Sequence, residues 1–237
     1  MGRNDEARHL GEDTLARRRR VLGEDHPDTL SSASNLASML RALDEFQAAR
    51  ELDEDTLARR RRVLGEDHPD TLSSASNLAV SLRALGDAEE AREMDQDTLA
   101  RRRRVLGEDH PDTLVSASNV ASMLRALGDA EAAREMDRDT LARRRRVLGE
   151  DHPDTMMSAS SLAADLRALG EFQSARELDE DILARRRRVL GEDHPDTTQS
   201  AAKLAIDIDK ERAVDLHDEE EDDWDDDDIG PEEIPHG

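Results

Sequence analysis

Five histidines recur at a fixed interval of 42 residues, and each is followed by Pro-Asp; they are His26, His68, His110, His152 and His194. Imidazole nitrogens can ligate a metal ion, but histidines in separate repeats lie on the order of 10 Å apart if neighbouring helices pack normally, which is too far for one ion. A proline preceded by a side chain that can cap instead indicates the first turn of a helix. We therefore expect a structural role for these histidines, with no metal and no cofactor.

Runs of four arginines are the second repeated feature that could carry chemistry. The block Leu-Ala-Arg-Arg-Arg-Arg-Val-Leu-Gly-Glu-Asp-His-Pro-Asp-Thr begins at Leu15, Leu57, Leu99, Leu141 and Leu183. Four consecutive residues cover most of a helix circumference, and Asp55 precedes Arg59 in the favourable i,i+4 order. We expect a solvated, self-paired outer face here rather than a phosphate-binding site. The net charge of −24 argues against binding to nucleic acid.

The rest of the sequence argues against an enzyme and against a membrane protein. There is no cysteine, so a thiolate nucleophile and a disulfide framework are both excluded. Each candidate catalytic group recurs unchanged where a single active site would be needed. No stretch approaches the roughly 20 consecutive apolar residues of a membrane span, and the first nine residues are polar. We expect a non-catalytic cytoplasmic protein with no membrane contact.

The elements that position these residues are helices. Only 1% of the residues are aromatic, so the core must come from Leu, Ala, Val and Met. Apolar residues recur every three or four positions from Pro69 to Gly86, and again from Ala88 to Gly107. We call the first helix type A and the second type B. A turn of about two residues between them requires an antiparallel hairpin, so the array is predicted to be an all-α solenoid.

The spacing of the apolar residues also resembles a known family. The pattern Asn-Leu-Ala-x-x-Leu-x-x-x-Gly-x-x-x-x-Ala at 77–91, followed by Val-Leu-Gly-x-x-His-Pro-Asp at 105–112, is similar to tetratricopeptide repeats of the 42-residue type found in kinesin light chains and in many bacterial proteins. The resemblance implies a right-handed α-solenoid that binds other proteins. One departure is Asp in the middle of the type B helix, where the family usually has an aromatic residue, so we expect leaner hairpin packing at Asp53, Asp95, Asp137 and Asp179.

Two regions are expected. Residues 1–214 form the solenoid, with five 42-residue units of which the first starts in the middle of a repeat, as in a remnant or excised end of a longer array. Residues 215–237 hold 13 acidic residues and neither Lys nor Arg, which is typical of a disordered acidic tail.

The resemblance implies that the type A helices line a concave groove. Amides in one register can bond the backbone of an extended peptide or a neighbouring helix, and both interpretations stay open for Asn35, Asn77 and Asn119. Guanidinium groups in a second register are expected to pair with carboxylates of a peptide, unless Asp and Glu at nearby turns neutralise them; these are Arg41, Arg83, Arg125 and Arg167.

The single tryptophan, Trp224, lies between acidic residues in the tail. The resemblance suggests a second role for it, because kinesin light chain repeats bind cargo peptides in which Trp is flanked by acidic residues. Trp224 is therefore a candidate pseudo-ligand that docks in the groove of its own chain or of a neighbour.

Three functions remain open at this stage. The leading hypothesis is a protein–protein interaction scaffold that binds extended acidic peptides and is masked by its own tail. The second is a sensor or autoinhibitory arm of a bacterial NB-ARC-type signalling NTPase. The third is a structural array that self-associates through its repeat ends or tail.

Overall fold

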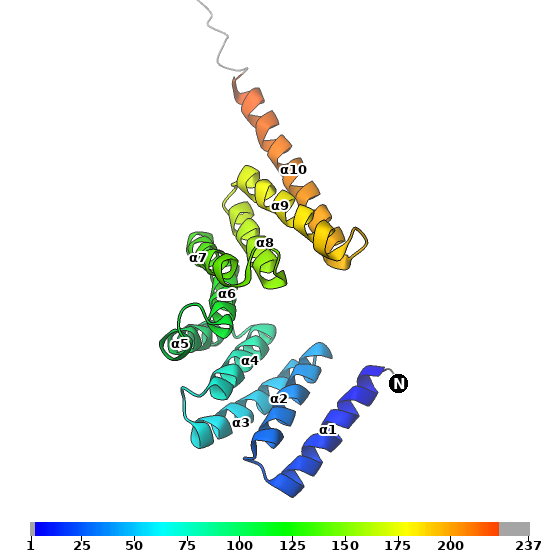
Figure 1. Ribbon diagram of the computed structural model, residues 1–237, viewed down its shortest axis with the longest axis vertical. Coiled ribbons are helices and arrows are strands. Elements are labelled where there is room, and N and C mark those ends of the chain that lie inside the picture. Colours follow the sequence, from blue (N-terminus) through cyan, green and yellow to red (C-terminus); the bar gives the residue numbers. More distant parts are fainter. Residues whose placement is uncertain (1–2, 223–237) are drawn as a thin grey trace, which may run out of the picture. The chain divides into compact units, whose positions relative to one another are not determined.

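The computed structural model describes residues 3–222, and every element in that range is a helix (Figure 1). The chain consists of two compact units, residues 1–147 and 148–237. The first contains α1 (Arg3–Leu22), α2 (Pro27–Ala42), α3 (Phe46–Leu64), α4 (Pro69–Leu85), α5 (Ala88–Leu106), α6 (Pro111–Ala126) and α7 (Ala130–Leu148, which ends at the boundary). The second contains α8 (Pro153–Ala168), α9 (Phe172–Leu190) and α10 (Pro195–Asp222).

The helix hairpin predicted from the sequence is confirmed. The even-numbered helices are of type A and the odd-numbered helices are of type B. Successive helices pack on one another from α1 to α6 in the first unit and from α8 to α10 in the second, and α2 also contacts α4. Helix α4 ends at Gly86, whose left-handed backbone (φ 90°) carries the chain into α5 within two residues. An all-α architecture built from helix hairpins, as predicted from the repeat, is therefore what the described residues form.

The histidines cap the type A helices, as expected. His68 Nδ1 accepts a hydrogen bond from the backbone N–H of Asp70 at 3.1 Å, while Pro69 occupies the first turn. At the other four turns the same bond, 3.1 to 3.2 Å long, is accepted by Nδ1 of His26, His110, His152 and His194. Each histidine thus satisfies one of the backbone N–H groups that a helix start leaves without a partner.

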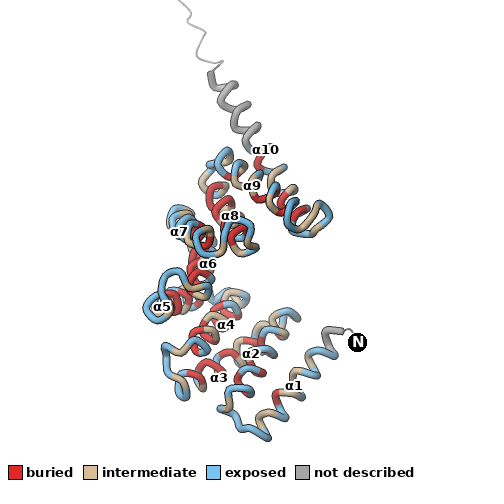
Figure 2. The backbone as a smooth tube through the Cα atoms, in the orientation of Figure 1, coloured by how far each residue is buried: buried red, intermediate tan, exposed pale blue. Residues whose placement is uncertain are grey.

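Most of the buried hydrophobic residues are leucines and alanines. Figure 2 shows buried residues alternating with exposed ones along the helices. One cluster joins Leu78, Ala79 and Leu82 of α4 to Ala91 of α5, and Met94 packs against it. Alanine is completely buried at equivalent positions of four type A helices, namely Ala37, Ala79, Ala121 and Ala163. These small side chains let neighbouring helices approach closely, which compensates for the lack of aromatic residues.

Helix α10 extends to Asp222 and so continues past residue 214, where the sequence suggested that the solenoid ends. Residues 223–237, including Trp224, lie outside the described residues. In residues 3–222 no helix combines the length and the hydropathy that crossing a bilayer requires.

Candidate peptide-binding site

The asparagine register lies on α2, α4 and α6, all within the first unit. Asn35 is exposed, and Asn77 and Asn119 are half-buried. Across the described part of this unit, none of the three amides makes a side-chain hydrogen bond. They are therefore not used to tie helices together, and their donors and acceptors are available to a ligand.

Small and apolar side chains flank the amides. Val80 and Val115 are 38% and 42% exposed, whereas the hydroxyl oxygens of Ser34, Ser76 and Ser118 are shielded from solvent. On α2, α4 and α6 the face accordingly offers one polar amide in each helix between small hydrophobic contacts. Uncharged residues line it until the last turn of each of these three helices, where the arginine register begins.

The arginines of that register point back into their own hairpins. Arg41 Nη1 lies 2.5 Å from Asp53 Oδ2 and 3.1 Å from the hydroxyl of Ser81. The ion pair recurs at 3.2 Å between Arg83 and Asp95 and at 3.6 Å between Arg125 and Asp137. In the second unit, Arg167 lies 2.6 Å from Asp179 and 2.7 Å from Asp207.

The carboxylates of these pairs are buried, and burial dominates their ionisation. Desolvation raises the pKa of Asp95 to about 6 against the lowering effect of Arg83 and Arg102. Desolvation also raises the pKa of Asp53, although the hydroxyl of Ser81 and the charge of Arg41 oppose it. For Asp207 the pKa is about 6, because desolvation, together with the negative charge of Asp179, outweighs Arg167 and Lys210.

These pairs change two expectations. The mid-helix aspartates are not gaps in a lean hairpin, because each is the buried partner of an arginine twelve residues earlier in the chain. The carboxylates that pair with the arginine register come from helices rather than from the turns: one from the type B helix of each hairpin and, for Arg167, also Asp207 of α10. The sequence carried a signal for this, since the Arg–Asp spacing of twelve recurs in four repeats. Arg83 and Arg125 keep the most exposed side chains, at 24% and 26%, against 13% for Arg41 and 16% for Arg167.

The four arginines of one run do not all have the same role. Arg59 pairs with Asp55, as predicted, and both Arg59 and Arg62 reach Asp25 in the preceding turn. Arg61 is exposed near Glu66. The second arginine of the run is where the expectation of a solvated face is wrong, because Arg60 is buried and donates to the carbonyl of Asp70 and the hydroxyl of Ser74. The same position is buried at Arg102, Arg144 and Arg186.

Among the residues that the structure describes, no group of three or more His, Cys, Asp or Glu side chains is placed to hold a metal ion. The five capping histidines use Nδ1 for the helix start, one in each inter-repeat turn.

Comparison with known proteins matches this architecture. The model of the tetratricopeptide repeat family matches residues 1–62, 31–102, 70–145, 115–185 and 155–207. No curated protein matches the chain. Similar solved structures include nearly identical TPR-like repeats attributed to a putative kinesin light chain of Podosopora anserina, at 31% identity over 80% of this chain and 90% of that chain, with a TM-score of 0.66. A single-residue variant of those repeats gives 31% identity over 79% and 88%, with a TM-score of 0.68. BtubC from P. vanneervenii has a TM-score of 0.74 over 100% of this chain and 98% of that chain, at 20% identity, and so shares the fold.

Proposed function

Because the chain belongs to the tetratricopeptide repeat family, in its kinesin light chain-like type, we propose that it is a scaffold that binds an extended segment of a protein partner along α2, α4 and α6. Repeats of this family generally mediate protein–protein interaction and are generally non-catalytic. The single observation that carries the proposal is that three amides in one register, Asn35, Asn77 and Asn119, make no side-chain hydrogen bond to any described residue.

A side-chain amide suits an extended peptide because it presents a donor and an acceptor together, as the peptide backbone does. Each amide can therefore bond one backbone N–H and one C=O of the partner, whatever the partner's sequence. Val80 and Val115 beside them give apolar side chains of the partner a surface to cover. The amides would bind the backbone of the partner, and the surface between them would contact its apolar side chains. This division accounts for the uncharged character of the face.

The preference for an acidic partner rests on Arg83. A guanidinium carries five N–H donors, and the pair with buried Asp95 engages only one side of the Arg83 group. The exposed part of the Arg83 side chain retains donors for a carboxylate of the partner. The attraction between Arg83 and a carboxylate of the partner is weaker than that of a free arginine, because an ionised Asp95 already neutralises the positive charge of the arginine beside it. An acidic residue is thus expected at one position of the bound segment.

Selection from a displayed library of short random peptides on the full chain tests this proposal. Selected peptides should bind at least about tenfold more weakly to the double variant Asn77→Ala, Asn119→Ala, because several hydrogen bonds of about 1 kcal/mol each are lost. The matched control is Gln96→Ala with Gln173→Ala, two exposed amides on type B helices. Selected peptides that bind the Asn77→Ala, Asn119→Ala variant as tightly as they bind the wild type would contradict the proposal.

Masking by the tail is a further part of the proposal, and its key residue lies outside the described residues. Trp224 and the acidic residues around it have the composition expected of a segment that would bind Arg83 and Arg125. A tail that binds there would compete with a partner protein for the same face. Emission from Trp224 would report this event directly, because the chain has no other tryptophan.

A further inference from the structure

The inter-repeat turns form a regular ion-pair lattice. In four of the five turns an aspartate accepts from the first and the fourth arginine of the next type B helix, as Asp67 does from Arg101 at 3.1 Å and from Arg104 at 2.7 Å. The arrangement recurs for Asp25, Asp109 and Asp151. These four copies define what one repeat contributes to the next.

The arginine pair of this contact is present on α1, and its aspartate is present in the last turn, before α10. On α1, Arg17 and Arg20 occupy the positions of Arg101 and Arg104, but the Arg17 side chain is 70% exposed, against 26% for Arg101. Arg17 pairs only with Asp13 of its own helix in the described residues. In the last turn Asp193 occupies the position of Asp67, and no arginine in the described part of the chain reaches it. Arg17 and Arg20 at one end and Asp193 at the other thus occupy the positions of the Asp–Arg–Arg contact that the chain makes in four turns.

The apolar faces next to these charges are complementary as well. Ala7 is exposed, although its equivalents Ala49, Ala91, Ala133 and Ala175 are completely buried, and Leu10 is 67% exposed. On α10, Ala205 is exposed although its equivalents in the other type A helices are completely buried. Leu204, Ala205 and Ile208 correspond to Leu78, Ala79 and Leu82, which pack on Ala91 and Met94; those two correspond to Ala7 and Leu10.

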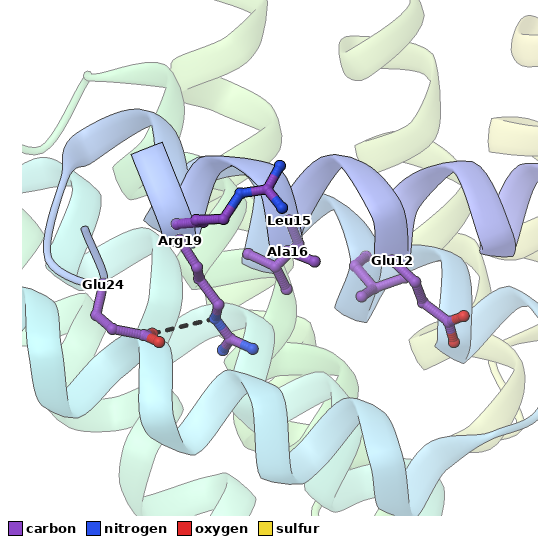
Figure 3. Close-up of a pocket in the computed structure, with 7 residues that line it drawn as sticks. Glu12, Leu15, Ala16, Arg19 and Glu24 are labelled. Carbon is purple, nitrogen blue, oxygen red and sulfur yellow. Dashed lines mark ion pairs between the residues drawn. The ribbon is translucent and has the colours of Figure 1, made fainter. Parts of the chain in front are cut away.

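Figure 3 shows Arg19 in its own ion pair with Glu24, beside a cavity of about 530 Å³ along α1. A second cavity, of about 250 Å³, lies between α1 and α2 and is lined by Ala7, Leu10, Gly11 and Met39 among others. In the next repeat, Arg41 of the preceding type A helix lies between Asp53 and Ser81. Gly11 occupies the position of Asp53, and Met39 occupies that of Ser81. The cavity therefore lies where the preceding type A helix packs elsewhere in the unit.

We propose that α10 of one copy of the chain packs on α1 of a second copy, with Asp193 between Arg17 and Arg20 of that copy, so that copies associate head to tail and continue the repeat. Leu204, Ala205 and Ile208 then cover Ala7 and Leu10, and α1 gains the type A helix that every other type B helix has. The interface is heterologous, so the assembly is open-ended and grows with concentration.

The ends also depart from the repeat together. Position 11 is Gly where the other type B helices have the buried aspartate, and position 209 is Asp where the other type A helices have its arginine. A carboxylate at position 11 would be buried at the junction without an arginine, which is costly. The junction therefore omits both members of the pair, and it is weaker than an internal hairpin for that reason.

Sedimentation velocity of the full chain at near-physiological salt, over a wide range of concentration, tests the junction. The wild type should rise in mean mass above the 26.5 kDa of the monomer as concentration increases. Arg20→Asp and Asp193→Arg should each weaken association at least about tenfold, because each places like charges opposite one another at the junction. Because neither residue has an ion-pair partner within the described chain, both variants should keep the helicity and thermal midpoint of the wild type.

An equimolar mixture of the two variants is the decisive sample. In that mixture the unchanged Asp193 of the Arg20→Asp copy can meet the unchanged Arg20 of the Asp193→Arg copy, which restores the wild-type junction. At the next junction the two substituted side chains face each other with both charges reversed, so they still attract. The mixture should associate more strongly than either variant alone. A wild type that remains at 26.5 kDa at every concentration, an Asp193→Arg variant that associates like the wild type, or a mixture that stays monomeric would each overturn the proposal.

Two further variants separate this proposal from peptide binding and test its register. The double variant Asn77→Ala, Asn119→Ala should associate like the wild type, because these residues lie away from both ends. The double variant Gly11→Asp, Asp209→Arg restores the ion pair that the junction lacks and should tighten association. Weaker association of that variant would show that α10 and α1 do not meet in the register of an internal hairpin.

Discussion

The guanidinium of Arg83 lies 3.2 Å from the carboxylate of Asp95, and that carboxylate is almost completely buried in the hairpin of α4 and α5. The pair is asymmetric, because Arg83 keeps about a quarter of its side chain in contact with solvent. Asp95 bears the larger desolvation cost, and this is why its pKa rises to about 6 although an arginine lies beside it.

Substitution of Asp95 should make folding less dependent on pH. The folded-state pKa of about 6 lies above the ordinary value of 3.8, so the native state binds this proton more tightly than the unfolded state. The stability it contributes is present below about pH 4 and is lost as pH rises through about 6. Asp95→Asn cannot ionise. Its free energy of unfolding, relative to that of the wild type, should therefore rise by on the order of 3 kcal/mol from about pH 4 to about pH 7. Urea unfolding at both pH values measures the change, and an equal difference at the two would contradict it.

Asp67 provides the opposite sign and serves as the control. Desolvation raises its pKa, but the hydrogen bonds and the positive charges of Arg101 and Arg104 together outweigh this and hold the pKa below its usual value. Its contribution to stability is therefore present at neutral pH and is lost as pH falls through the folded-state pKa. Asp67→Asn should cost more stability at neutral pH than in acid. A loss that grew toward acid pH would show that the lattice in the turns is not electrostatic.

Neighbouring arginines in one run should respond differently to the same substitution. Arg60→Met removes the donor to the carbonyl of Asp70 and to Ser74, and it should destabilise the protein by about 2 to 4 kcal/mol. Arg61→Met removes an exposed side chain and should change stability by about 0.5 kcal/mol or less. Denaturant midpoints of the two variants compare them under identical conditions. Equal effects would mean that the burial of Arg60 contributes nothing.

The contrast between Arg60 and Arg61 also shows where sequence analysis stops. Helix bounds are local, so Pro69 and Gly86 predicted both ends of α4 correctly, and the repeat fixed which helices are neighbours. Four identical arginines contain no pattern that tells which one faces the next helix, because burial is decided by where that helix crosses. The pairing of Arg83 with Asp95 was readable only as a recurring spacing of twelve, since a helix-to-helix contact has no fixed sequence separation.

The candidate site was predicted with similar limits. The asparagine register follows from the repeat alone, because position within a helix decides which face a residue occupies. Whether those amides bond a neighbouring helix was left open by the sequence, and the lack of such bonds in the described residues depends on the packing. The exposure of Ala7, Ala205 and Asp193 could not be distinguished from the sequence, because their equivalents in other repeats are the same residue types.

The histidine caps should be replaceable by a residue that accepts the same bond. His68→Ala leaves the N–H of Asp70 without its acceptor and should destabilise the protein by about 1 kcal/mol. His68→Asn supplies an oxygen at the helix start and should recover most of the loss. Thermal unfolding followed by circular dichroism distinguishes the two. An Asn variant no more stable than the Ala variant would assign the effect to packing of the ring.

Docking of the acidic tail on the solenoid should be visible in the emission of Trp224, the only tryptophan of the chain. Burial of an indole adds about 2 to 3 kcal/mol, whereas exposed ion pairs add about 0 to 1 kcal/mol each, so charge gathers the tail and Trp224 holds it. We expect blue-shifted emission at low salt that moves to the red at high salt, because a Debye length of roughly 8 Å at physiological ionic strength shortens further.

The variant for this test must remove the attraction without creating repulsion inside the hairpin. Arg83→Gln with Arg125→Gln is suitable, because a glutamate at position 83 would place a second carboxylate against buried Asp95. The double variant should shift the emission of Trp224 to the red at low salt and leave the helicity unchanged. Arg62→Gln with Arg104→Gln is the matched control, since these arginines lie in the turn lattice. Emission typical of a water-exposed indole under every condition, or equal shifts in both double variants, would show that the tail does not bind through the arginine register.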